Sequence, residues 1–284
     1  MKYIEIKAPA KINIGLNVVK KRDDGFHDLE TFFYPIYDLH DTVSFELADH
    51  FDFECDNDEL NSENNNIVLK AHQSVENYVG KKLLVKIKLK KNIPTGAGLG
   101  GGSSDAAATL ISLNELFNLK ISYNSLIKIA LELGSDVPFF IKAKAAIGRS
   151  RGEKLTIVDF ELPYNIVIVN PGIHISTKEA FKNIYPKSAN IDYSKVFHNH
   201  ASFLKNMKNV KNDFEEYVFT SYPSIKEIKE KLLEQGAIFS LMSGSGSSVY
   251  GLFKEEINMA QLTNVFPSNY FVCVSRMQDS YFGY

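Results

Sequence analysis

The chain has 284 residues, with 32 lysines and arginines against 34 aspartates and glutamates, so its formal net charge is −2. This balance lacks the basic excess of a dedicated nucleic-acid-binding protein, so we expect no nucleic-acid partner. A hydrophobic content of 44% is typical of a globular protein with a packed core and excludes a largely disordered chain. Five of the 17 glycines lie between Gly96 and Gly102.

The two cysteines, Cys55 and Cys273, are far apart and neither belongs to a C-x-x-C pair, so neither a disulfide framework nor a cysteine zinc site is expected. The first residues lack the apolar core of a signal peptide. No later stretch reaches the roughly 18 consecutive apolar residues of a membrane span. We therefore predict a cytoplasmic protein without a membrane partner. The expected oligomeric state, a monomer or a weak homodimer, does not follow from these patterns.

In the first half of the chain, alternating apolar and polar residues predict a half-buried strand over 3–19 and a strand with one solvated lysine face over 83–91. Apolar residues at helical spacing predict a helix over 103–117, with Ser103 and Ser104 as candidate caps. A further helix is predicted over 123–133 and ends at Gly134.

In the second half, the patterns predict extended segments over 139–141 and 166–169, helices over 177–184, 214–219 and 225–233, and strands over 238–242, 249–253 and 270–275. Strands and helices are mixed without a strict βαβ rhythm. We therefore predict an α+β fold with two lobes, divided into domains 1–150 and 151–284.

A glycine-rich segment, PTGAGLGGGSSD at 94–105, lies between a predicted strand and a predicted helix. Glycines leave backbone N–H groups open to a ligand, and a following helix directs its positive dipole end to the same place, so the segment predicts a phosphate-binding loop. It has neither the Walker A pattern nor a dinucleotide fingerprint. The alternative is a flexible turn or a glycine-rich hairpin. The predicted phosphate-binding residues are Pro94, Thr95, Gly96, Ala97, Gly98, Leu99, Gly100, Gly101, Gly102, Ser103 and Ser104.

This segment resembles the phosphate loop of the GHMP kinase superfamily, as do KAPAKIN at 7–13 and MSGSGSSV at 242–249. Within that superfamily, AKIN at 10–13, DGFH at 24–27 and GSDVPFF at 134–140 are most similar to the 4-diphosphocytidyl-2-C-methyl-D-erythritol kinases. The resemblance implies a two-lobed GHMP kinase fold. Its N-terminal lobe would bind ATP and carry out catalysis, and its C-terminal lobe would cover the substrate.

The resemblance also implies a reaction, the ATP-dependent phosphorylation of the 2-hydroxyl of 4-diphosphocytidyl-2-C-methyl-D-erythritol in the non-mevalonate isoprenoid pathway. It makes Asp136 the general base and places Lys11 beside the acceptor hydroxyl; their ordinary alternatives are a turn aspartate and a surface lysine. An aspartate pKa of about 3.9 is too low to deprotonate an alcohol beforehand, so the proton leaves as the phosphoryl group arrives. Mg²⁺ is expected to arrive with ATP, and no protein metal ligands are predicted.

For a small-molecule substrate with a cytidine diphosphate group, the resemblance implies further contacts. Phe26, His27 and Phe181 would hold the cytosine, since a base stacks favourably on an aromatic ring. Asn13 would contact the polyol end, and Gly244 with Ser245 would lie beside the diphosphate or close the site. Phe181 is otherwise a helix core residue, and the glycine turn a plain hairpin. Two other functions remain open, another small-alcohol kinase of the homoserine or mevalonate type and a catalytically silent nucleotide-binding relative.

Overall fold

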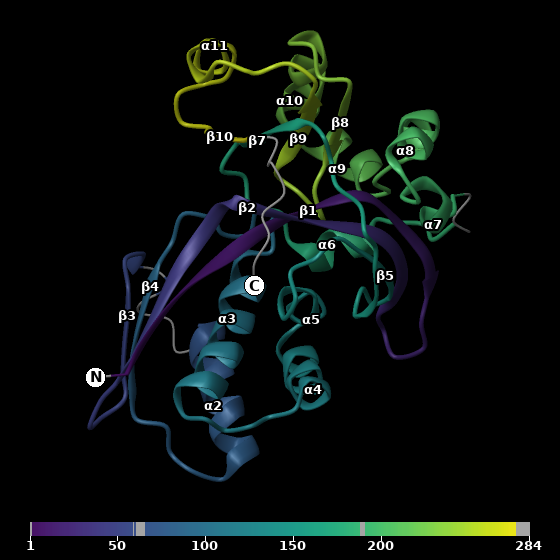
Figure 1. Cartoon of the computed structure of the whole chain (residues 1–284). Helices are drawn as coiled ribbons and strands as arrows, with labels where there is room; N and C mark the ends of the chain where they lie inside the picture. Colours follow the sequence, from purple (N-terminus) through teal and green to yellow (C-terminus); the bar gives the residue numbers. More distant parts are fainter. Residues whose placement is uncertain (1, 59, 61–65, 188–190, 277–284) are drawn as a thin grey trace. The chain divides into compact units, whose positions relative to one another are not determined.

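The structure is a computed structural model that describes residues 2–58, 60, 66–187 and 191–276 (Figure 1). The chain divides into two compact units, each built from separate segments. The first unit comprises Met1–Lys11, Pro35–Thr95 and Gly100–Lys144, and the second comprises Ile12–Tyr34, Gly96–Leu99 and Ala145–Tyr284. The mixture of helices and sheets confirms the predicted α+β class. The predicted division into domains 1–150 and 151–284 stays a prediction. It differs in kind from the two compact units, because each unit combines several separate segments of the chain.

The first unit combines antiparallel and parallel strand pairs with a layer of helices. Strand β4 pairs antiparallel with β2 and parallel with β3, and β1 pairs with β2. Figure 1 shows the helices of this unit on one side of these strands. The elements that lie wholly or partly in this unit are β1 (Tyr3–Lys21), β2 (His27–Leu47), β3 (Asp52–Cys55), α2 (Ile67–Val79), β4 (Val85–Lys90), α3 (Gly101–Leu116), α4 (Tyr123–Leu133) and α5 (Val137–Phe140); β1 from Ile12 and β2 up to Tyr34 belong to the second unit.

Local sequence signals account for several of these elements. In β4 the apolar residues are buried while Lys88 and Lys90 are exposed, which confirms the predicted lysine face. Helix α4 begins where the Ser122 side chain accepts a hydrogen bond from the Ser125 N–H, and it spans the predicted residues 123–133. The predicted extended segment over 139–141 is wrong. Its first residues belong to the short helix α5, which has Pro138 in its first turn, where proline's fixed φ favours a helix start.

Strand β1 departs from the prediction of a half-buried strand. The apolar side, including Ile12 and Ile14, is buried as expected, but the polar side is buried as well: Lys11 and Asn13 are each 2% exposed. In this strand, the alternation therefore separates apolar from polar side chains, but it does not identify a face exposed to solvent.

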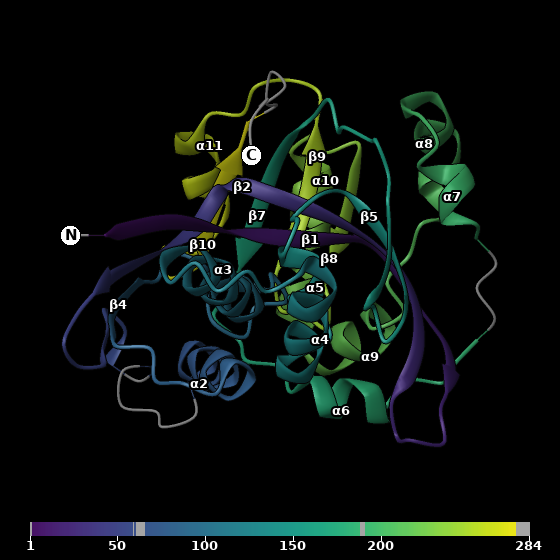
Figure 2. The ribbon, with the colours of Figure 1, turned by 60° about the horizontal axis from the view of Figure 1, so that its bottom comes forward.

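The second unit contains a four-stranded antiparallel sheet in the order β10-β7-β9-β8. Helix α10 packs against β8 and β9 (Figure 2). The N-terminal part of β2 also belongs to this unit and pairs with β5, which in turn pairs with β6. The elements are β5 (Ala146–Ser150), β6 (Lys154–Ile157), β7 (Asn165–Asn170), α6 (Thr177–Lys182), α7 (Tyr193–Val196), α8 (His200–Asn206), the 3-10 helix η1 (Met207–Asn209), α9 (Glu215–Ser221), α10 (Pro223–Glu234), β8 (Phe239–Met242), β9 (Val249–Phe253), α11 (Met259–Val265) and β10 (Phe271–Ser275).

Apolar side chains from one face of this sheet form a buried core in the second unit. The buried residues Val167 and Val169 of β7 pack with Phe214, Ile225 and Ile228 from the helical region. Burial of each such side chain contributes about 1.5 to 3 kcal/mol, so this core dominates the stability of the unit. Among the described residues, no helix is long and apolar enough to cross a membrane.

Candidate active site

The first unit brings together the two predicted catalytic residues. Lys11 lies on β1, and its Nζ is 3.4 Å from Oδ2 of Asp136. The Lys11 side chain is only 3% exposed, whereas that of Asp136 is 36% exposed. A buried lysine needs an anionic partner, so Asp136 fixes the buried ammonium group, and only the carboxylate side of the pair is partly exposed to solvent. The interpretation of Lys11 as a solvated surface charge is wrong.

Asp136 is held by the apolar helix that follows it. It occupies the position directly before α5, whose four residues, Val137–Phe140, are all buried. The Phe140 ring packs against Gly100: a Cβ atom at Gly100 would lie 2.7 Å from Cζ of Phe140 and 3.1 Å from Cγ of Lys11. Only a residue without a side chain allows this approach. The Lys11–Asp136 pair and the first residues of α3 are therefore neighbours.

The N-terminus of α3 has the features of an anion site. Gly100 precedes the helix with a left-handed φ of 73°, and no side chain caps the first turn. The 16-residue helix thus offers its first N–H groups and its positive dipole end to a ligand. The prediction that Ser103 and Ser104 cap the helix is wrong, because both lie inside its first turn. The Oγ of Ser104 is buried without a hydrogen-bond partner among the described residues.

The middle of the glycine segment, Gly96–Leu99, belongs to the second unit and is bound to the turn between β8 and β9. The Ser243 hydroxyl donates to the Gly98 carbonyl at 2.9 Å, and the Ser248 N–H donates to the Ala97 carbonyl at 3.1 Å. Gly98 has a φ of 76°, and a Cβ there would lie 2.1 Å from the Ser243 carbonyl oxygen. Glycine is required at this position for both reasons.

The same turn carries Gly244 and Ser245, and hydrogen bonds from polar side chains fix its position. The Asn212 amide donates to the carbonyls of Met242 and Gly244, each at 2.8 Å. Ser245 and Thr177 share a hydroxyl hydrogen bond of 3.1 Å. The turn between two strands is as predicted, and its role at the substrate stays a prediction. The turn joins two antiparallel strands, so the alternative of a plain hairpin remains open.

Asn13 is part of a buried hydrogen-bond chain. Its amide donates to the Thr31 hydroxyl at 2.8 Å, and that hydroxyl donates to the Gly15 carbonyl at 2.6 Å. The Asn13 backbone N–H donates to Ser243 Oγ at 3.2 Å. The side chain is thus fixed in one orientation, as a binding residue requires.

Two of the three predicted aromatic residues lie together in the second unit. The rings of His27 and Phe181 are stacked, 4.8 Å apart between centroids with an interplanar angle of 16°. Phe181 also packs edge-on against the buried Phe214, so it has a core contact as well as a stacking partner. Burial lowers the pKa of His27, and the charge of Lys21 lowers it further. The imidazole is therefore mainly neutral near pH 7 and offers one donor and one acceptor.

Phe26 has a different environment. Its side chain is exposed, and the Arg151 guanidinium lies 3.7 Å from the ring centroid. Arginine stacks favourably on an aromatic face, so Arg151 stabilises the position of this ring. Sequence reasoning missed Arg151, because nothing in the local sequence connects the two residues. It also missed Asn212, and although Ser243 lies in the motif at 242–249, its contact with the Gly98 carbonyl was not predicted.

Metal ligands were not predicted from the sequence. In the part of the chain that the structure describes, no group of three or more His, Cys, Asp or Glu side chains is arranged to hold a metal ion.

Two family models match the chain. The GHMP kinases N terminal domain matches residues 66–144, which include the glycine segment and Asp136. The GHMP kinases C terminal domain matches residues 187–272, which include the turn at Gly244.

Relatives of the whole chain agree with these matches. The 4-diphosphocytidyl-2-C-methyl-D-erythritol kinase of Chlorobium phaeobacteroides is 43% identical over 269 residues, covering 90% of this chain and 91% of that protein. The enzyme of the same name from Azobacteroides pseudotrichonymphae is 44% identical over 252 residues, covering 87% and 92%.

Solved structures show the same fold. A crystal structure of 4-(cytidine 5'-diphospho)-2C-methyl-D-erythritol kinase matches with a TM-score of 0.77 at 28% identity, covering 95% of this chain and 98% of that one. A homoserine kinase from Cytophaga hutchinsonii matches with a TM-score of 0.70 at 18% identity, covering 98% and 95%, and supports the fold alone. The chain belongs to the GHMP kinase superfamily and, within it, to the family of 4-diphosphocytidyl-2-C-methyl-D-erythritol kinases.

Proposed function

We propose that this chain transfers the γ-phosphoryl group of ATP to the 2-hydroxyl of 4-diphosphocytidyl-2-C-methyl-D-erythritol, a step of the methylerythritol phosphate pathway to isoprenoids. The observation that carries the proposal is the Lys11–Asp136 pair at 3.4 Å, which lies against the uncapped start of α3. The substrate assignment rests on the names of relatives that are about 40% identical over most of the chain.

The start of α3 receives the phosphates in this proposal. The first N–H groups of the helix point out of its N-terminus, and Gly100, Gly101 and Gly102 carry no side chains that would cover them. A phosphate at this place gains hydrogen bonds and the favourable helix dipole. ATP supplies the transferred phosphoryl group, and the protein positions it.

Lys11 and Asp136 act on the acceptor hydroxyl. Asp136 accepts a hydrogen bond from the hydroxyl and takes its proton as the new O–P bond forms, since a carboxylate is too weak a base to remove it earlier. The positive charge of Lys11 stabilises the negative charge that develops on the transferring group. Its burial strengthens this effect, because few water molecules screen the charge.

In this proposal the rest of the substrate is bound by Asn13, Phe26, His27, Phe181, Gly244 and Ser245. An imidazole that is mainly neutral can donate to and accept from the edge of a cytosine, and an aromatic face stacks on its ring. The hydrogen bonds of Asn13 and the β8–β9 turn keep these groups in place before binding, which lowers the entropic cost of recognition.

Mg²⁺ belongs to the proposal as a partner of ATP, since it neutralises charge between the β- and γ-phosphates. A cytoplasmic location and a monomeric or weakly dimeric state also remain predictions. Neither is needed for the chemistry above.

The direct test mixes the protein with ATP, Mg²⁺ and 4-diphosphocytidyl-2-C-methyl-D-erythritol and follows ADP release. We expect turnover that saturates with both substrates. Homoserine and mevalonate serve as competing acceptors. Turnover with either of them but not with the cytidyl substrate would point to another small-alcohol kinase, and nucleotide binding without any turnover would point to a catalytically silent relative.

A further inference from the structure

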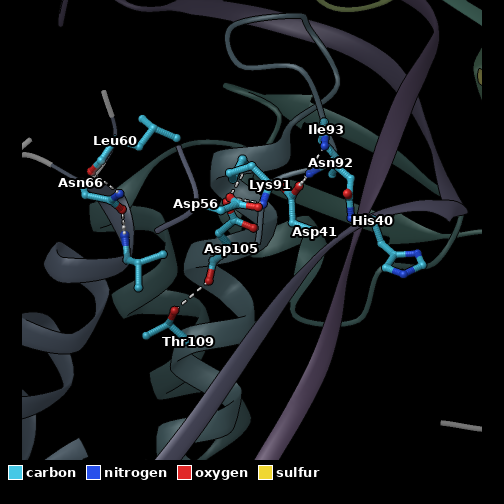
Figure 3. A network of polar contacts seen from close by, with 11 residues as sticks. His40, Asp41, Asp56, Leu60, Asn66, Lys91, Asn92, Ile93, Asp105 and Thr109 are labelled. Atoms are coloured by element: carbon cyan, nitrogen blue, oxygen red, sulfur yellow. Dashed lines mark hydrogen bonds and ion pairs between the residues drawn. The ribbon is translucent and has the colours of Figure 1, made fainter. Parts of the chain in front are cut away.

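Three charged side chains meet in the interior of the first unit (Figure 3). The Lys91 ammonium bridges two carboxylates: it forms a short ion pair with Asp41 and a second one of 2.7 Å with Oδ2 of Asp105. The exposed fractions of these side chains are 8% for Lys91, 0% for Asp41 and 3% for Asp105. We call these three residues the loop clamp.

The loop clamp binds the chain on the N-terminal side of the glycine segment. Besides Lys91, the Asp41 carboxylate accepts hydrogen bonds from the backbone N–H groups of Asn92 at 2.6 Å and Ile93 at 2.8 Å. These two residues directly precede Pro94, where the segment begins. Asp41 therefore determines the position at which the segment leaves β4.

The loop clamp also binds the chain on the C-terminal side of the segment. Asp105 is the fifth residue of α3, one helical turn after its start. Gly101, the first residue of the helix, lies close to Ile93 and Asp41: a Cβ there would lie 3.0 Å from Cγ2 of Ile93 and 3.3 Å from Oδ2 of Asp41. Lys91 thus joins the strand that enters the segment to the helix that leaves it.

The charges of the loop clamp explain why Lys91 is needed there. An unpaired carboxylate within the second turn of α3 would repel a phosphate at the helix start. Lys91 cancels one of the two negative charges, and burial with the neighbouring Asp41 raises the pKa of Asp105. Oδ1 of Asp105 is buried and has no hydrogen-bond partner among the described residues, which further disfavours its ionised form.

Stability alone does not account for such a group. Buried ion clusters contribute little net stability compared with well-packed apolar side chains, because all the charges must be removed from water. What the cluster provides is a fixed geometry, since a lysine with two carboxylate partners can occupy few other positions.

We propose that Asp41, Lys91 and Asp105 are positioning residues that hold both ends of the glycine segment. They orient the N-terminus of α3 and limit the negative charge near it, so that it can bind nucleotide phosphates. The proposal rests on the proposed function, because it takes the phosphates of ATP as the ligand of α3. The loop clamp itself touches no substrate and acts only through the helix and the segment.

The test measures binding of Mg²⁺ and a non-hydrolysable ATP analogue by calorimetry, together with kcat and the two KM values. Lys91→Met removes the bridge. Lys88→Met is the matched control, since Lys88 lies on β4 in an ion pair with Glu54 in which both side chains are more than half exposed. We expect Lys91→Met to weaken analogue binding and raise KM for ATP about tenfold or more, because a charge-assisted contact is lost. KM for the cytidyl substrate should change less than about twofold, and the control should match the wild type.

A second variant covers the case in which Lys91→Met does not fold. Lys91→Met combined with Asp105→Asn removes the bridge without leaving two uncompensated carboxylates, and we expect it to fold and still bind the analogue at least about fivefold more weakly than the wild type. Wild-type affinity in this folded variant would overturn the proposal, as would an equal rise of both KM values. If the wild type itself bound no analogue, the proposed function would fail first, and the role of the loop clamp with it.

Discussion

Gly98→Ala tests the packing of the glycine segment against the β8–β9 turn. The new Cβ would lie 2.1 Å from the Ser243 carbonyl oxygen and 3.0 Å from that of Gly246. Both contacts are with backbone atoms, so the chain itself must move by about 1 Å to reach an ordinary contact distance. The movement strains the 2.9 Å hydrogen bond from Ser243 to Gly98.

The magnitude follows from three contributions. A left-handed φ costs alanine about 1 to 2 kcal/mol, overpacking adds about 1 to 3 kcal/mol, and a weakened hydrogen bond adds about 1 kcal/mol. Gly172→Ala is the matched control: Gly172 lies in the same unit with a φ of 74°, and a Cβ there meets nothing within 4 Å. The difference between the two variants removes the first contribution and isolates the close approach.

The assay is urea unfolding followed by circular dichroism, with the free energy of unfolding compared between the two variants and the wild type. We expect Gly98→Ala to be destabilised by about 2 to 4 kcal/mol more than Gly172→Ala. A difference below about 0.5 kcal/mol would refute the reasoning, because the segment would then tolerate a side chain where the structure leaves no room for one.

Three further changes have defined outcomes. Asp136→Asn should lower kcat by about 100-fold or more while the affinity for an ATP analogue changes less than about twofold; an unchanged kcat would remove Asp136 from the role of base. His27→Ala should raise KM for the cytidyl substrate and leave KM for ATP unchanged, and the reverse pattern would assign His27 to the donor side. Burial, and to a smaller extent Asp41, raises the pKa of Asp105 from 3.8 to about 7 against the lowering effect of Lys91. Its contribution to stability is therefore full below about pH 4 and is lost as the pH rises through 7, by about 3 kcal/mol between pH 5 and 8. Asp105→Asn should remove this loss, and unfolding curves of both proteins that depend equally on pH would contradict the assignment.

Elements with a clear period could be predicted from the sequence. Strand β9 was expected over 249–253 and helix α4 over 123–133, and both have these bounds. The β4 lysine face was predicted for the same reason, since alternation and burial coincide in a strand with one solvated face. Strand β2 was missed. Its 21 residues include buried polar positions such as Thr31 and Asp41, and these obscure the alternation.

The two predicted catalytic residues illustrate what local patterns omit. Lys11 alternates with apolar neighbours, which indicated a solvated side, yet it is buried because Asp136 lies against it from a distant part of the sequence. Their assignment to one site came from the resemblance to the GHMP kinases, which the comparisons confirm as the family. Periodicity could not have supplied it.

Contacts between distant residues were beyond the reach of the sequence. Ser243 binds the Gly98 carbonyl 145 positions away, and Asn212 binds the Gly244 carbonyl 32 positions away. Asparagine is common in turns, so the local sequence does not single out Asn212, and the motif at 242–249 that contains Ser243 does not show which carbonyl this hydroxyl contacts. Only the fold shows that they hold the glycine segment and the β8–β9 turn.

The central claim is that the chain phosphorylates the 2-hydroxyl of 4-diphosphocytidyl-2-C-methyl-D-erythritol. The most direct measurement is phosphorus NMR of the product formed from this substrate, ATP and Mg²⁺, with Asp136→Asn as the control. The account predicts one new phosphomonoester signal, assigned to the 2-position, that appears with ADP and is nearly absent from the control. A product phosphorylated at another hydroxyl, or an equal signal from the Asp136→Asn protein, would contradict it.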